Sequence, residues 1–101
     1  MNISTKQAGA ETTLELSGRF DFNSHRDFRT SYEAALKNSA TRTINLNMAQ
    51  VDYLDSSALG MLLLLNEKAR AANIEIVISS CPQSVRKIIE VANFSKIFKI
   101  L

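Results

Sequence analysis

The residues best suited to chemistry in this chain are two adjacent serines that follow an acidic turn. Asp52, Asp55, Ser56 and Ser57 lie between a strand-like segment and a strongly apolar helical segment. The first turn of a helix exposes backbone N–H groups without internal partners and carries partial positive charge. A phosphate is therefore tolerated there, and it adds roughly two negative charges to a surface that is already acidic. We expect Ser56 to be a phosphorylation site that changes which proteins bind nearby.

The same residues also have a purely structural interpretation, and the sequence leaves it open. A serine or aspartate before an apolar helical run is a common N-cap, worth about 1 kcal/mol. Both interpretations hold together if one side chain caps the helix while another hydroxyl stays exposed.

An enzymatic role for these residues is not supported. Ser56 and His25 with an aspartate do not form a recognisable triad, because the chain has no Gly-x-Ser-x-Gly elbow. The three glycines do not form a phosphate-binding loop. One histidine and one cysteine, Cys81, are too few for a structural zinc site. We therefore expect no catalytic activity, no cofactor and no bound metal.

The helix after the serines is unusually apolar on all sides. Its first two turns contain Leu59, Met61 and the leucines 62–65, whereas a helix packed on one sheet should have a polar outer face. Either some of these side chains form an exposed surface for a protein partner, or neighbouring helices bury them. Asp21, in an earlier loop, lies near the serines if both loops are at the same end of the sheet. We expect Asp21, Asp55, Ser56, Ser57, Leu59 and Met61 to bind partners.

Alternating and helical periodicities predict the order β-β-α-β-α-β-α-β, and hence an α/β fold with a mixed sheet of about five strands covered by helices on one side. Gly18 is expected to end the second strand, and Ser24 with Asp27 resembles a capping box for the first helix. The expected strands are 3–7, 12–17, 41–48 with an extension to 54, 75–78 and 97–101. The expected helices begin near residues 24, 57 and 82, and the second ends near 72.

The composition limits the remaining possibilities. A length of 101 residues suits one domain over residues 1–101, and 46% apolar with 22% charged residues is typical of a globular protein. A net charge of +2 without a basic run argues against direct nucleic-acid binding. The apolar run 62–65 is too short to span a bilayer, and the N-terminus lacks the pattern of a signal peptide. We expect a cytoplasmic protein.

Three segments together resemble the STAS domain, and within it the bacterial anti-sigma factor antagonists. They are Gly18-Arg19-Phe20-Asp21, Ile44-Asn45-Leu46-Asn47 and the run from Val51 to Gly60. The Asp-Ser-Ser-x-Leu-Gly element within the last segment is the most specific of them. The family often has glycine where this chain has Ala58.

The resemblance implies a function and a set of partners. Such antagonists sequester an anti-sigma factor and so free a sigma factor. The anti-sigma factor is often also a serine kinase that phosphorylates the antagonist at the position of Ser56, and a PP2C-type phosphatase removes the phosphate. Asp55 would flank the acceptor hydroxyl, Ser57 would help to cap the helix, and Asp21 would lie at the partner surface. The alternative is a STAS-like subunit of a lipid or anion ABC-transport assembly, which binds the ATPase.

Overall fold

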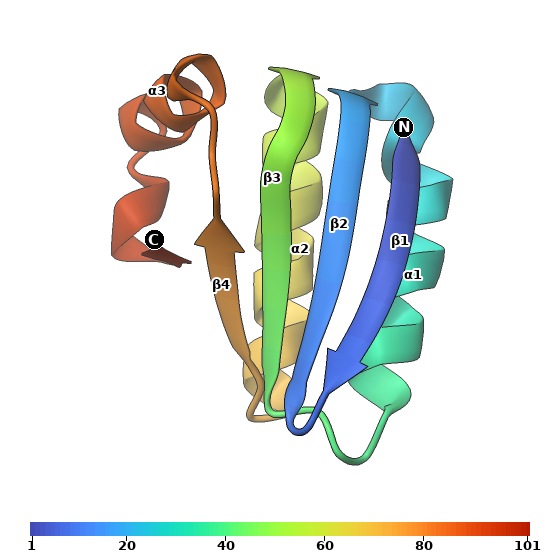
Figure 1. Cartoon of the computed structure of the whole chain (residues 1–101). Coiled ribbons are helices and arrows are strands. Elements are labelled where there is room, and N and C mark those ends of the chain that lie inside the picture. The colour runs from blue at the N-terminus through green and yellow to red at the C-terminus, as the bar shows by residue number, and fades with distance from the viewer.

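Strands and helices alternate along the chain in the computed structural model, which describes residues 1–101 (Figure 1). The strands are β1 (Asn2–Ala8), β2 (Glu11–Phe20), β3 (Thr43–Leu54), β4 (Glu75–Ser79) and β5 (Lys99–Ile100). The α-helices are α1 (His25–Lys37), α2 (Ser56–Ala71) and α3 (Gln83–Val91), and short 3-10 turns lie at Phe22–Ser24 and Phe94–Lys96. The predicted order is confirmed, although the last strand is shorter than expected.

The strands form one mixed sheet in the order β1-β2-β3-β4-β5. β1 pairs with β2 antiparallel, and the other three pairings are parallel. Parallel neighbours need a crossover connection, which α1 and α2 supply for the two central pairs. Both helices lie behind the sheet in Figure 1, so they cover the same face. The predicted α/β fold with a five-stranded mixed sheet is confirmed.

Side-chain alternation along the central strands separates a buried face from a polar one. Leu14 and Leu16 of β2 are buried, as are Ile44, Leu46 and Met48 of β3, while the residues between them are half-buried and polar. On the polar face, Ser79 Oγ donates a hydrogen bond to Asn45 Oδ1 at 2.6 Å. The apolar face therefore packs against the helices, and the other face carries no comparable core.

The third helix completes the same core from a different position. In Figure 1, α3 lies beyond the upper end of β4, at that edge of the sheet. Its buried residues Val85 and Ile89 belong to one cluster with the buried residues of α1, α2 and the strands. None of the three α-helices combines the length and the apolar composition that crossing a lipid bilayer requires.

Gly18 corrects one prediction about the strands. Its φ of 94° is a conformation that side-chain-bearing residues rarely adopt, and the register between β2 and β3 shifts between Gly18 and Arg19. The irregularity is a bulge, after which β2 continues to Phe20. The prediction that Gly18 ends the strand is therefore wrong, and the two extra residues carry the strand to the site described below.

Candidate functional site

Parallel pairing of β2 and β3 brings two loops together at one end of the sheet. Phe20 is the register partner of Leu54, and the Asp55 N–H donates to the Phe20 carbonyl at 3.3 Å. Asp21 and Asp55 are the residues at which the two strands give way to loop and helix. The sequence left open whether these two loops share one end of the sheet, and the register establishes that they do.

Asp55 is the residue that caps α2. Its backbone is extended (φ −111°, ψ −177°), and its Oδ1 accepts a hydrogen bond from the Ala58 N–H at 3.0 Å. This bond satisfies one of the donors that a helix start leaves without a partner. The helix begins at Ser56, one residue earlier than predicted, and the capping bond comes from Asp55 and not from Ser57. Ala58 is fully buried, so its methyl group faces the core.

The two serines differ in their environment. Ser56 is exposed, whereas Ser57 is half-buried. Ser56 lies at the first position of α2, where the unpaired N–H groups and the helix dipole favour negative charge. Asp52 is exposed three residues before Asp55. The structural interpretation of the motif and the exposed hydroxyl therefore coexist, because Asp55 caps the helix and leaves Ser56 accessible.

Asp21 has a local structural task of its own. Its Oδ1 accepts from the Asn23 N–H at 3.0 Å, and its N–H donates to Ser24 Oγ at 3.4 Å, which closes a capping box around the 3-10 turn. Ser24 is buried and makes no side-chain capping bond to α1. The predicted capping box of Ser24 with Asp27 is therefore wrong, because the Ser24 hydroxyl is already used by the preceding turn.

Arg19 extends this acidic end of the sheet with one cation. Its Nε lies 3.5 Å from Asp21 Oδ2, and its guanidinium carbon lies 3.9 Å from the centre of the Tyr53 ring. Such stacking of arginine on an aromatic ring contributes roughly 0.5–1 kcal/mol at exposed sites. Arg19 therefore links Asp21 with Tyr53 at the end of β3, beside the Asp-Ser-Ser segment.

The outer side of α2 is an exposed stripe that starts at Ser56. Leu62 and Leu65 are buried, and Leu59 and Met61 are half-buried against the core. We call the exposed positions of its first three turns the α2 stripe: Ser56, Gly60, Leu63, Leu64 and Glu67. Leu63 is 39% exposed and Leu64 is 44% exposed. The two alternatives for this helix are thus both partly correct, because two of its five leucines are buried and two face outward.

One exposed aromatic near the stripe was not among the predicted site residues. Phe22 is 65% exposed, and its ring stacks on His25 with the ring centres 5.3 Å apart. Both belong to the segment between β2 and α1 that follows Asp21. In the sequence, the two aromatics in Phe20-Asp21-Phe22 indicate that an aromatic side chain could lie near Asp21. Only the structure distinguishes the buried Phe20 from the exposed Phe22, however.

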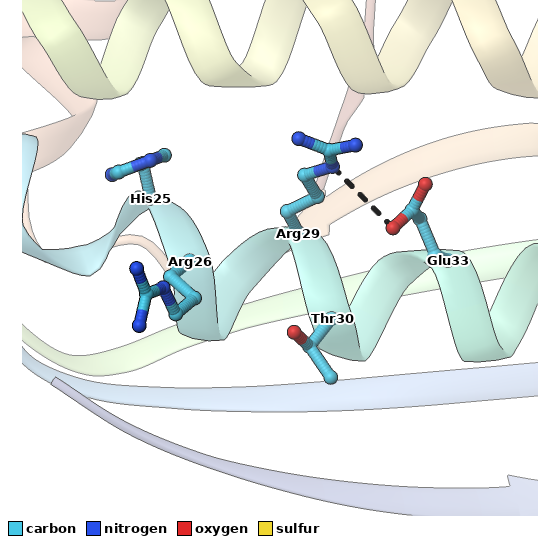
Figure 2. Close-up of a pocket in the computed structure, with 5 residues that line it drawn as sticks. All are labelled: His25, Arg26, Arg29, Thr30 and Glu33. Carbon is cyan, nitrogen blue, oxygen red and sulfur yellow. Dashed lines mark ion pairs between the residues drawn. The ribbon is translucent and has the colours of Figure 1, made fainter.

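The surface of α1 next to α2 is rich in charge. Figure 2 shows His25, Arg29 and Glu33 along the side of α1 nearest the neighbouring helix, whereas Arg26 and Thr30 point away from it. Glu33 pairs with Arg29 at 3.4 Å and with Lys68 of α2 at 3.6 Å. No group of three His, Cys, Asp or Glu side chains is arranged to hold a metal ion.

Cys81 lies apart from this surface, in the loop that leads to α3. It is half-buried, and burial raises the pKa of its thiol, an effect that the positive charge of Arg86 partly offsets. A raised pKa leaves little of the reactive thiolate at neutral pH. Cys81 therefore acts as a small packing residue beside the core.

Comparisons with known proteins match the chain over nearly its whole length. Residues 3–101 match the family model described as "Mlab, STAS domain". A Pseudomonas aeruginosa protein named as STAS-domain containing is 46% identical over 92 residues, which cover 91% of this chain and 89% of that protein. BtrV of Bordetella bronchiseptica, provisionally named as an anti-sigma factor antagonist, is 28% identical over 66% of this chain and 58% of its own.

The fold is also that of a solved anti-sigma factor antagonist. SpoIIAA in its unphosphorylated form superposes with a TM-score of 0.82 at 18% identity, covering 99% of this chain and 88% of that one. The phosphorylated form of SpoIIAA from Bacillus gives a TM-score of 0.75 at 17% identity, covering 99% and 91%.

Proposed function

The chain belongs to the STAS domain family, and we propose that it acts as an anti-sigma factor antagonist whose partner binding is switched by phosphorylation of Ser56. In its unphosphorylated form it binds an anti-sigma factor and so frees a sigma factor. The observation that carries this proposal is the exposed Ser56 hydroxyl at the head of the α2 stripe. The cytoplasm is where these partners meet, so the protein acts there.

The local geometry supports a switch that leaves the fold intact. Asp55 makes the capping bond, so a phosphate on Ser56 displaces no hydrogen bond of the helix start. The helix dipole partly offsets the added charge within the protein. A partner docked over the α2 stripe would meet both the bulk and the roughly two negative charges of the phosphate. Modification would therefore weaken binding without unfolding the chain.

The proposed partners follow from this chemistry. An anti-sigma factor with serine kinase activity would transfer the phosphate to Ser56, and a PP2C-type phosphatase would remove it. Asp21, Asp55 and Ser57 would border the acceptor, while Leu59 and Met61 would support the contact surface from below. The BtrV relationship and the SpoIIAA-like fold support the antagonist role. The protein needs no catalytic group of its own for this function.

One observation favours a second function. The description of the matching family model names Mlab and no anti-sigma factor. A STAS-like subunit of a lipid or anion ABC-transport assembly would bind an ATPase through the same face and would need no phosphate on Ser56. The two functions therefore differ in whether modification at this serine occurs and changes binding.

The proposal is tested by incubating the purified chain with its anti-sigma factor and ATP. We expect mass spectrometry to find one phosphate on Ser56, none on the Ser56→Ala chain, and unchanged incorporation on the Ser57→Ala chain. Incorporation at another residue, or none with an active kinase, would refute the assigned site. Tight binding to an ABC-transporter ATPase, with the same affinity for the wild-type and the Ser56→Asp chains, would favour the second function.

A further inference from the structure

We propose that the hollow between α1 and α2 receives an apolar side chain from an acidic segment of the anti-sigma factor. This inference rests on the proposed function and extends its binding surface from Ser56 to a second, separate anchor. The argument uses the shape of the hollow, the charges around it and its continuity with the α2 stripe.

The hollow has the size and lining of an anchor site. It encloses about 100 Å³, with Met61 and Leu64 at its surface and the buried side chains of Phe28 and Tyr32 as its floor. A water molecule occupies about 30 Å³ in the liquid, so the space suits one medium-sized apolar side chain. Water finds few hydrogen-bond partners in an apolar depression of this kind, so an apolar side chain is the favoured occupant.

The rim of the hollow is positively charged. The Arg29 guanidinium lines it directly, and the Lys68 ammonium lies 5.7 Å from the centre of the Tyr32 ring. The single carboxylate at this rim is Glu33, which is shared between Arg29 and Lys68. Two cations thus compete for one anion, and positive charge is left over.

Neighbouring charges do not reverse this balance. Arg26 makes no ion pair, but it points away from α2 and does not line the hollow, so it leaves the charge at the rim unchanged (Figure 2). The other acids of the two helices, Asp27 and Glu67, do not line this hollow, and Asp27 lines a separate depression with Arg26. A partner segment that carries carboxylates next to its apolar side chain is therefore the complementary occupant.

The hollow is continuous with the surface proposed to sense phosphorylation. Leu64 belongs both to the wall of the hollow and to the α2 stripe that begins at Ser56. His25 also lies in the wall and stacks on the exposed Phe22, which follows Asp21. A partner that covers Ser56 and continues along α2 by two turns would reach the hollow. The phosphate and the anchor would then act at two ends of one interface.

The experiment measures binding of the purified anti-sigma factor to the full chain by isothermal titration calorimetry. Leu64→Ala should weaken binding by about tenfold, as truncation of an apolar anchor does. Arg29→Gln should weaken it roughly three- to fivefold and make the affinity less sensitive to salt. Val91→Ala and Lys37→Gln are the matched controls. Val91 is 77% exposed on α3, and Lys37 is exposed at the far end of α1; both variants should bind like wild type.

Three results would overturn the inference. If Ser56→Asp weakens binding while Leu64→Ala and Arg29→Gln bind like wild type, the hollow is no anchor, although the proposed function stands. If the wild-type chain does not bind the anti-sigma factor, the proposed function and this inference fail together. If the chain forms a dimer that Leu64→Ala abolishes, the hollow belongs to a second copy of the chain. Unchanged melting temperatures of the variants exclude misfolding as the cause.

Discussion

The Asp55 carboxylate accepts the Ala58 N–H at 3.0 Å and thereby caps the helix that Ser56 begins. The residue before the proposed acceptor thus holds the helix start in place, and the acceptor hydroxyl itself has no part in that task. In the proposed switch, the stability of the helix start depends on Asp55 and the modification on the adjacent Ser56. This separation can be tested by changing each residue alone.

Replacing Asp55 should lower the free energy of unfolding by the amount that an N-cap hydrogen bond contributes. We expect Asp55→Ala to reduce the free energy of unfolding by roughly 0.5–2 kcal/mol, and Asp55→Asn to reduce it by much less, because asparagine is also a good cap. Urea denaturation followed by circular dichroism measures both values. Equal losses for the two variants would contradict the capping role, and Ser57→Ala serves as the control with little expected loss.

The buried and exposed leucines of α2 should respond differently to the same substitution. Leu62 is fully buried, whereas its neighbour Leu63 faces outward. We expect Leu62→Ala to lower the free energy of unfolding by roughly 2–5 kcal/mol, because it leaves a cavity in the core. Leu63→Ala should change it by about 0.5 kcal/mol or less. Similar losses in urea titrations would mean that the orientation of α2 is wrong.

The Gly60→Ala substitution should raise the stability of the chain and weaken partner binding. Gly60 lies inside α2 on the exposed stripe, and an added Cβ would meet no atom within 4 Å. Gly60→Ala should therefore stabilise the chain by up to about 1 kcal/mol through helix propensity. The same methyl group would hold a partner away from the helix backbone beside Ser56, so binding should weaken. A chain that is more stable and binds its anti-sigma factor equally well would contradict this role of Gly60.

Cys81 should be slow to react at neutral pH. Burial raises the pKa of its thiol, so a smaller fraction is thiolate at a given pH than in the unfolded chain, and thiolate is the nucleophile. Arg86 lowers the pKa, so Arg86→Gln should raise it further and slow the reaction more. Iodoacetamide alkylation followed by mass spectrometry from pH 7 to 9 measures the rates. Faster alkylation of the folded chain than of the chain in urea would contradict this.

The element order and the core could be predicted from the sequence because they rest on local periodicity. Leu14 and Leu16, or Ile44 and Leu46, alternate with polar residues and so define the buried face of their strands. The acidic turn and the helix start predicted Ser56 as the candidate site, and the family resemblance added the antagonist role as an expectation.

The remaining features depend on contacts between distant segments. In the sequence, Gly18 predicts the end of a strand. Pairing with β3 instead continues to Phe20, and Gly18 forms a bulge within β2. Ser24 has the spacing of a cap for α1, yet its hydroxyl donates to the Arg19 carbonyl at 2.9 Å. The hollow exists only because Tyr32 and Leu64 come from different helices. No local pattern encodes these three features.

Direct measurement of partner affinity in two states of Ser56 tests the central claim. The anti-sigma factor should be titrated into the unphosphorylated chain, the chain phosphorylated on Ser56 and the Ser56→Ala chain, all at the same ionic strength. We predict tight binding by the first and third and at least about tenfold weaker binding by the second, because the phosphate adds bulk and charge at the contact surface. Equal affinity of all three for the anti-sigma factor would contradict the account.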